Sequence, residues 1–422
     1  MRWFRCTYTD AKHIRNNSPQ WYFMLKQSEL SIGTLGHVDH GKTTLVSAIT
    51  HQWTDVHSES VKRSMTIKLG YAEAVISSCE DGGYTTEKKC SDGSEAKQVR
   101  RISLLDAPGH ETLMATAIAG SSIIDGALFV ISATEPCPMP QTREHLMIIN
   151  ALGIKNVVIA QTKVDIVGKE QAVKSYGQIK DFIKGSRIEN APIIPVMANK
   201  NINVDKILEE IVNIGVPKRN TESDPIMYIA RSFDVNKPGT KINKLVGGVI
   251  GGSVVKGKFK VGDEIEIRPG MGSSKEKQKR ESYEPIIARV ESLSAGEDKL
   301  EEAIAGGLIA VGTDMDPSLT KADGLVGQVV GKAGKLPEQF NEITLSYVSL
   351  NRPDVPKQAF RNDEPLILGV GTGTVVGYVK TARKNSIEVS LNRPICIDKS
   401  AKISVLRNLS QRWRLSGYGN IV

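Results

Sequence analysis

Cysteines and long apolar runs are scarce in this chain of 422 residues. Nothing approaches the run of about 20 apolar residues that crosses a bilayer as a helix, so we expect no membrane-spanning helix and no membrane partner. The five cysteines are odd in number and scattered, which argues against a disulfide framework and favours a reducing, cytoplasmic location. They are Cys6, Cys79, Cys90, Cys137 and Cys396.

The excess of basic over acidic residues is also small. The 55 basic and 47 acidic residues leave a net charge of +8, which is compatible with a nucleic-acid or ribosomal partner without demonstrating one. A hydrophobic content of 40% and a charged content of 24% suit a globular protein with a full-sized core. The length predicts two or three domains.

The stretch from Gly36 to Thr43 fits G-x-x-x-x-G-K-[ST], the loop that wraps nucleotide phosphates. The residues before it, 31–35, are typical of a buried strand, and residues 44–49 begin a helix. In this context the backbone amides are expected to point at a phosphate. Lys42 supplies a mobile charge, and the Thr43 hydroxyl is a suitable magnesium ligand.

Short apolar runs alternate with helical stripes from residue 31 to about residue 218. The runs 101–105, 126–131, 156–160 and 192–196 are typical of strands covered on both faces by helices. Helical periodicity links Ile148, Ile149 and Leu152, and also Val204, Ile207, Leu208, Ile211 and Val212. The pattern predicts a doubly wound α/β P-loop domain with a mostly parallel sheet.

Beyond a polar, proline-flanked segment at 216–225 the chain becomes rich in β-type runs punctuated by glycine. We therefore expect one or two β-barrels to follow the α/β domain, with a second boundary at 336–338. The predicted limits are 1–29 for a loose N-terminal tail, 30–220 for the nucleotide-binding α/β domain, 221–334 for barrel two and 335–422 for barrel three. The tail could also reflect a true start at Met24 rather than Met1.

Two further loops indicate which nucleotide is bound. The sequence Asp106-Ala107-Pro108-Gly109 ends a strand, where Asp106 can hold magnesium through water and the Gly109 amide can meet the terminal phosphate. Thr162-Lys163-Val164-Asp165 follows another strand. The Asp165 carboxylate can accept two hydrogen bonds from guanine, one from N1–H and one from the exocyclic amine. Adenine has no such pair of donors. The three loops together predict a guanine nucleotide.

These loops, with Thr142-Arg143-Glu144-His145, resemble the translational GTPases related to elongation factor Tu. Within that group, several stretches resemble the gamma subunits of translation initiation factor 2, the carriers of initiator tRNA. They are residues 65–72, 106–114, 231–240, 247–252 and 316–323. The resemblance runs from about Ser31 to the end of the chain. It implies one GTP domain and two β-barrels.

The resemblance also implies roles for individual residues. The nucleotide-binding set would be Asp39, His40, Gly41, Lys42, Thr43, Thr44, Asp106, Gly109, Thr162, Lys163, Val164, Asp165, Met197, Ala198 and Asn199. The magnesium set would be Asp39, Thr43, Ser64 and Thr66. His110 would orient the attacking water, or would be turned away until a ribosome or activating protein positions it.

Some positions depart from the family pattern. Thr162 stands where the family has Asn, so we expect the shorter side chain to lose a bond of about 1 kcal/mol to the phosphate loop and to weaken nucleotide binding. Met197 stands where the family has Ser, just before Ala198 in the loop that contacts the O6 atom of guanine. Cys79 and Cys90 are what remains of the family's zinc knuckle, and two cysteines are too few for a structural zinc, so a metal-free loop is expected.

The resemblance implies a slow GTPase that carries methionylated initiator tRNA to the small ribosomal subunit. Its implied cofactors are GTP, GDP and Mg²⁺. Its implied partners are the alpha and beta subunits of the factor and GTPase-activating and nucleotide-exchange factors. The basic run 275–280 could be a solvated loop or a tRNA contact, and residues 412–414 are expected in the core and rim of barrel three.

Three alternatives remain open at this point. One is another tRNA-delivering GTPase, such as the selenocysteine elongation factor. Another is the large subunit of a GTP-coupled sulfate adenylyltransferase, and a third is a GTP-binding scaffold that never hydrolyses its nucleotide.

Overall fold

The computed structural model describes residues 26–54, 70–107, 123–273, 282–350, 358–409 and 411–422. Several predicted features lie outside these residues: Met24, Ser64, Thr66, Gly109, His110 and the basic run 275–280. Among the described helices, none has the length and apolar character needed to cross a membrane.

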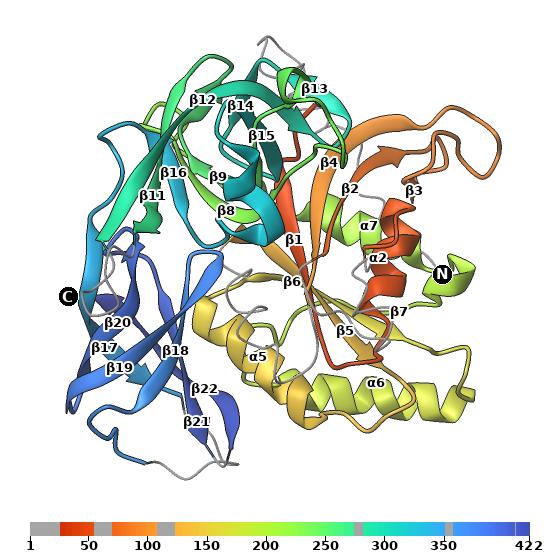
Figure 1. The fold of residues 1–422 in the computed structure, drawn as a ribbon. Helices are drawn as coiled ribbons and strands as arrows, with labels where there is room; N and C mark the ends of the chain where they lie inside the picture. Colours follow the sequence, from red (N-terminus) through yellow and green to blue (C-terminus); the bar gives the residue numbers. More distant parts are fainter. Residues whose placement is uncertain (1–25, 55–69, 108–122, 274–281, 351–357, 410) are drawn as a thin grey trace.

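The predicted α/β domain is confirmed and is built on one mostly parallel sheet (Figure 1). Its strand order is β3-β2-β4-β1-β5-β6-β7, in which β2 runs antiparallel to β4 and the remaining long strands run parallel. The strands are β1 (Leu30–Leu35), β2 (Gly70–Ser78), β3 (Tyr84–Thr85), β4 (Lys97–Asp106), β5 (Gly126–Ser132), β6 (Asn156–Thr162) and β7 (Ile193–Pro195). Every residue of β1 and β5 is buried, as expected of strands covered on both faces.

Helices cover the two faces of this sheet with separate apolar cores. Helices α2 (Lys42–Thr50) and α7 (Val204–Asn213) contribute to one core, and α5 (Pro140–Leu152) and α6 (Lys169–Ile183) contribute to the other. The predicted helical stripe of α7 is buried at Val204, Ile207, Leu208 and Ile211. The sheet thereby fixes the carboxyl ends of β1, β4 and β6 at one edge, where ligands bind in folds of this kind.

Two β-barrels follow, as predicted. Barrel two closes through β11–β12 pairing in the order β11-β16-β8-β9-β15-β12, with β13 at its edge. Its strands are β8 (Ile226–Phe233), β9 (Val249–Lys256), β11 (Glu264–Ser273), β12 (Ser282–Ala295), β13 (Asp298–Leu300), β15 (Ile309–Thr313) and β16 (Val329–Lys332), beside the small pair β10 (Lys258–Lys260) and β14 (Glu302–Ile304). Three 3₁₀ turns, η4 (Ala198–Lys200), η5 (Ile242–Lys244) and η6 (Pro317–Asp323), complete the described elements of the two domains.

Barrel three is closed in the order β17-β20-β19-β18-β21-β22. Its strands are β17 (Gln339–Ser349), β18 (Pro365–Val370), β19 (Gly373–Arg383), β20 (Ser386–Cys396), β21 (Ile403–Leu409) and β22 (Arg412–Ile421). Trp413 packs in a cluster with Ile148 of α5, and Arg414 pairs with Glu144 of the same helix. Both residues lie on a strand of barrel three, as expected, and they also contact the α/β domain.

The cysteines require a correction. Cys79 and Cys90 form a disulfide across the lobe between β2 and β4, whereas the sequence reasoning expected reduced, scattered thiols. An odd number of cysteines does not exclude one disulfide between two of them that lie close in sequence. Of the remaining described cysteines, Cys137 is half-buried and Cys396 is buried, and both are free.

Candidate nucleotide-binding site

The phosphate loop joins β1 to α2 as the sequence predicts. Gly41 caps the helix with a left-handed backbone (φ 88°), and Asp39 also has a positive φ of 59°. Gly36 has φ 146°, and a Cβ placed on it would lie 2.2 Å from the Val130 carbonyl oxygen. Only glycine fits this close approach, which lets the loop turn tightly before α2 begins.

Lys42 is folded back over its own loop. Its Nζ donates to the carbonyl oxygens of Gly36 at 3.0 Å and His37 at 2.8 Å. Burial lowers the pKa of Lys42 to about 8, although the nearby carboxylates of Asp106 and Asp39 favour the charged form. The ammonium is thus held in the phosphate loop by acceptors that an anionic ligand can replace.

Asp106 is the centre of the site. It ends β4 beside Thr34 of β1 and is fully buried. Its carboxylate accepts hydrogen bonds from the hydroxyls of Thr43 at 2.6 Å, Thr34 at 2.9 Å and Thr54 at 2.9 Å. The structure therefore brings together two of the predicted nucleotide-site residues, Thr43 and Asp106.

This group of oxygens fits a magnesium ion. Mg²⁺ prefers hard oxygen ligands and is commonly held by one or two protein groups beside phosphates. Sequence reasoning missed Thr34 and Thr54 in this group. Thr34 had a signal, because it precedes the phosphate loop by two residues on the strand paired with Asp106. Thr54 had none, because it lies in an irregular segment after α2.

His40 attaches the phosphate loop to β5 and to the segment that follows it. Its side chain is buried, with Nδ1 3.2 Å from the Val130 carbonyl oxygen and Nε2 3.2 Å from Glu135 Oε2. Burial lowers the pKa of His40 to about 4, outweighing the hydrogen bonds to Glu135 and Val130. The ring is therefore neutral at pH 7, and Glu135 is a further residue that sequence reasoning missed.

Thr162 corrects an expectation. Its hydroxyl donates to the backbone carbonyl of His40 at 2.6 Å and lies 3.4 Å from the carbonyl oxygen of Ile131. The bridge between the base loop and the phosphate loop is thus present, so the expected loss of this bond was wrong. The shorter side chain reaches the phosphate loop because Thr162 is the last residue of β6 and is buried against it.

The predicted base loops lie side by side. Strands β6 and β7 are parallel and paired at Gln161 and Pro195, so the segments after them emerge at the same edge. Lys163 has a positive φ of 59°, and Asp165 Oδ2 lies 3.6 Å from Lys200 Nζ. Val164 lies between them in the sequence, while Ala198 and Asn199 form the first part of η4 after Met197. Thr44 and Asp39 are exposed at the phosphate loop.

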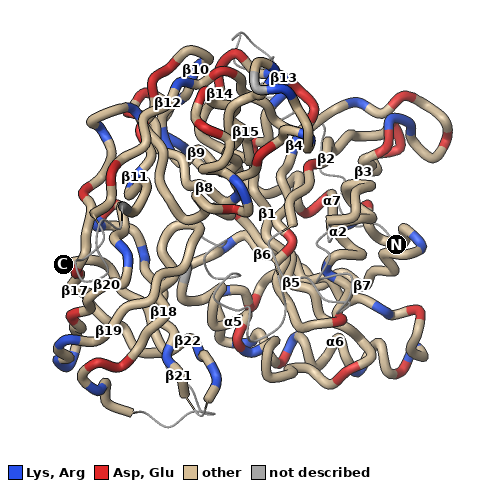
Figure 2. The backbone as a smooth tube through the Cα atoms, viewed as in Figure 1, with Lys and Arg blue, Asp and Glu red and all other residues tan. Residues whose placement is uncertain are grey.

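Basic and acidic residues are interspersed along the described chain (Figure 2). The small positive net charge is therefore not gathered on one element of the part that the structure describes.

The phosphate loop, the Asp106 strand end and the paired base loops define a P-loop GTPase domain carrying two β-barrels. Family models match in the same order: the elongation factor Tu GTP-binding domain at residues 27–216, elongation factor Tu domain 2 at 247–331, and the initiation factor eIF2 gamma C-terminal domain at 342–421. The chain belongs to the gamma-subunit family of translation initiation factor 2. It is 50% identical to the Pyrococcus horikoshii gamma subunit over 94% of this chain and 98% of that protein.

Another relative, from Methanococcus vannielii, is 48% identical over 94% of this chain and 99% of its own. Solved structures of selenocysteine factors share the fold. The bacterial selenocysteine-specific elongation factor EF-Sec matches with a TM-score of 0.71 and 24% identity over 93% of this chain, which spans 58% of that protein. Elongation factor SelB of Methanococcus maripaludis matches with a TM-score of 0.69 and 23% identity, over 94% of this chain and 79% of that one.

Proposed function

We propose that this chain is a GTP-dependent switch that binds methionylated initiator tRNA and delivers it to the small ribosomal subunit. The main support is the fully buried Asp106 carboxylate, which gathers three hydroxyls beside the phosphate loop. It occurs in a chain half identical to translation initiation factor 2 gamma subunits. The lower identity to selenocysteine factors supports only a shared fold.

In this proposal, Thr43 would hold a magnesium ion as a direct ligand and Asp106 would hold it through water. The bound ion would neutralise negative charge on the nucleotide phosphates. The amides of residues 39–44 and the Lys42 ammonium bind the phosphates. Ser64, Thr66, Gly109 and His110, which lie outside the described residues, complete the switches, and His110 orients water. Hydrolysis is slow until an activating partner positions that histidine.

The guanine base is bound between the two base loops. Asp165 accepts the N1–H and the exocyclic amine of guanine, Lys163 covers the ring with its stem, and the Ala198 amide meets the base oxygen. Thr162 holds this pocket in register with the phosphate loop through its bond to His40. Guanine recognition and phosphate binding are thereby coupled through one hydroxyl.

Replacing Asp165 with Asn tests the base assignment. An Asn amide cannot accept both guanine donors but can donate to the C2 carbonyl of xanthine. We expect Asp165→Asn to weaken GDP binding at least 100-fold, about 3 kcal/mol, and to favour xanthosine diphosphate. Titration with both nucleotides measures the effect, and Asp205→Asn on the exposed face of α7 is the control. Unchanged guanine preference in Asp165→Asn would contradict the assignment.

The tRNA assignment is tested by filter binding of the full chain with its alpha and beta subunits. We expect methionylated initiator tRNA to be retained in the presence of GTP and Mg²⁺, and much less in the presence of GDP. Equal retention of an elongator tRNA, or preferential retention of selenocysteine tRNA, would overturn the proposed cargo. The domain limits 30–220, 221–334 and 335–422 are part of the same proposal.

A further inference from the structure

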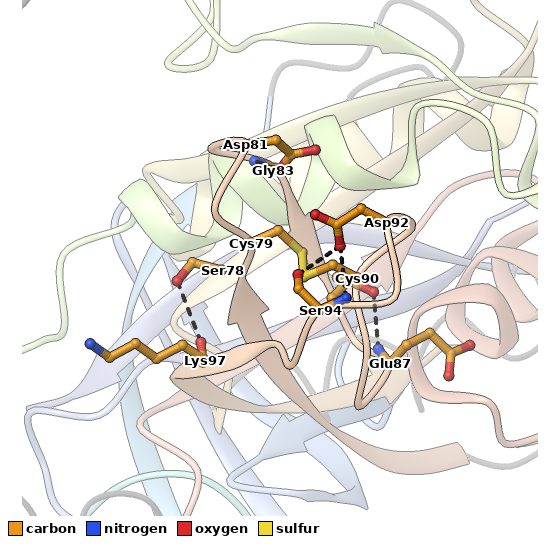
Figure 3. Close-up of a disulfide and its surroundings, with 10 residues drawn as sticks. Ser78, Cys79, Asp81, Gly83, Glu87, Cys90, Asp92, Ser94 and Lys97 are labelled. Carbon is orange, nitrogen blue, oxygen red and sulfur yellow. Dashed lines mark hydrogen bonds between the residues drawn. A yellow bond between two sulfur atoms is a disulfide. The ribbon is translucent and has the colours of Figure 1, made fainter.

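Two turns of the same construction face each other in the lobe between β2 and β4 (Figure 3). In the first, the Cys79 amide donates to the Gly83 carbonyl at 2.9 Å and the Gly82 amide returns a bond to the Cys79 carbonyl at 3.1 Å. The Gly83 amide also donates to Asp81 Oδ1 at 2.8 Å. These bonds fold the five residues 79–83 into one tight turn.

The second turn repeats each of these bonds eleven residues later. The Cys90 amide donates to the Ser94 carbonyl and the Gly93 amide donates to the Cys90 carbonyl, both at 2.9 Å, while the Ser94 amide donates to Asp92 Oδ1 at 2.9 Å. Gly82 and Gly93 share a φ of 85°. The cysteine that begins each turn is joined to its counterpart by a disulfide, with Cα atoms 5.8 Å apart.

The disulfide encloses the residues that dock this lobe onto the α/β domain. Tyr84 packs against the apolar core to which α2 and α7 contribute. The next residues reach the end of the phosphate-loop helix, where His51 Nε2 lies 3.0 Å from Thr86 Oγ1 and 3.5 Å from Glu87 Oε1. All three docking residues lie between Cys79 and Cys90, so the covalent bond closes the loop that presents them to α2.

We propose that Cys79 and Cys90 form a reversible thiol–disulfide site, which clamps the two turns together when oxidised and releases them when reduced. A dithiol reductant attacks one sulfur through a mixed disulfide, gives up two electrons and two protons, and leaves as a cyclic disulfide while Cys79 and Cys90 become thiols. Oxidised glutathione reverses the step by accepting two electrons and two protons as two glutathione thiols. The clamp therefore follows the redox state of the compartment.

The other two described cysteines, Cys137 and Cys396, form no disulfide. Burial raises the pKa of Cys137 and of Cys396 to about 12, so neither forms a thiolate readily. In the part of the chain that the structure describes, no group of three or more His, Cys, Asp or Glu side chains is placed to hold a metal. A covalent bond rather than an ion links the two turns. The redox clamp does not depend on nucleotide binding.

Alkylation of the full chain, isolated without reductant, provides the first test. We expect Cys79 and Cys90 to resist iodoacetamide and to appear as one cross-linked peptide in mass spectrometry. After dithiothreitol treatment both should be labelled, and oxidised glutathione should restore the link. Free thiols at both positions after glutathione oxidation, or stoichiometric zinc on the purified chain, would overturn the proposal.

Hydrogen exchange tests the clamp itself. Reduction should speed exchange of the turn amides at residues 79, 82, 90 and 93 by roughly tenfold or more, with no change in barrel three. The double variant Cys79→Ser with Cys90→Ser should show the fast rates with or without reductant. Cys137→Ser, which keeps the pair intact, should still respond to reduction. Equal rates in the oxidised and reduced wild-type chain contradict a clamp.

Discussion

At the scale of single residues, one hydroxyl connects the two halves of the nucleotide site. Thr162 Oγ1 donates to the His40 carbonyl at 2.6 Å, and both residues are buried. A buried carbonyl that loses its donor costs about 1–3 kcal/mol, more than the bond itself contributes. The alignment of the base loop with the phosphate loop therefore depends on a side chain that bonds to the backbone of the phosphate loop.

Thr162→Val removes this hydroxyl at nearly constant volume. We expect GDP affinity to fall about tenfold, equivalent to about 1.4 kcal/mol, because the His40 carbonyl is left without its donor. Isothermal titration of the two chains measures the change. Thr162→Asn, which keeps a donor, should not tighten binding relative to wild type, although the sequence analysis expected Thr162 to bind nucleotide more weakly than Asn. A Val variant with wild-type affinity would show that the bridge is dispensable.

His40 predicts how stability depends on pH. Its pKa is about 4 in the folded chain and 6.5 in the unfolded chain, because burial disfavours the charged ring. Between these values the unfolded chain binds more protons, so acidification from pH 6.5 to 4 should remove up to about 3 kcal/mol of stability. Above pH 6.5 this contribution is constant.

His40→Gln should reduce the loss of stability on acidification, measured by urea unfolding at pH 7, 6, 5 and 4. His51→Gln, in which an exposed side chain is replaced, is the control and should follow the wild type. An unchanged pH dependence in His40→Gln would show that groups other than His40 determine the acid response.

At the scale of elements, the glycines of β9 illustrate what the sequence could indicate and what it could not. Residues 247–252 were identified as a family signature, but their letters do not give the reason for glycine. In the structure, a Cβ on Gly252 would lie 1.9 Å from the Tyr228 carbonyl oxygen on β8, whereas a Cβ on Gly251 would meet nothing closer than 3.7 Å. The close packing of β9 on β8 therefore requires glycine at position 252 but not at position 251.

Gly252→Ala should destabilise barrel two by about 3 kcal/mol, because the β8 backbone must move to admit the methyl group. Gly251→Ala, on the same strand, should change stability by less than about 1 kcal/mol. Urea unfolding of both variants measures the difference. Equal stabilities of the two variants would mean that β8 and β9 can separate without cost.

The strands, helices and phosphate loop were predictable because their signals are local in sequence. Periodicity predicted α7 and the runs of β1 and β5, and the motif from Gly36 to Thr43 fixed the phosphate loop. Contacts made by the fold were not predictable. Thr54 reaches Asp106 across 52 residues and Glu135 reaches His40 across 95. The C-x-D-G repeat at Cys79 and Cys90 was visible, but only the fold shows that its two turns face each other.

At the scale of the whole molecule, both barrels contact the α/β domain through polar side chains. Gln27, just before β1, donates to the carbonyls of Ile304 and Gly306 in barrel two, both at 2.6 Å. On the other side, Lys402 of barrel three donates to the Ala151 carbonyl at the end of α5. A nucleotide-driven change in the α/β domain can therefore be transmitted to the relative position of the barrels.

The ion pair between Arg414 and Glu144 joins barrel three to α5 and is largely buried. The two side chains are 15% and 2% exposed, and Arg414 Nη1 lies 2.7 Å from Glu144 Oε1. Arg414→Met leaves the buried carboxylate without this guanidinium, so we expect about 3 kcal/mol less stable docking of barrel three. Lys380→Met removes an exposed pair with Glu342 and should cost less than about 1 kcal/mol.

Trp413 can report this docking because it packs in the same cluster as Ile148. In a chain whose other three tryptophans are replaced by Phe, its fluorescence should change at a lower urea concentration in Arg414→Met than in Lys380→Met. If barrel three is held mainly by the apolar contact of Ile148 with Leu406 and Leu415, the two variants will undock together. The buried pair would then fix the orientation of the barrel rather than the strength of its attachment.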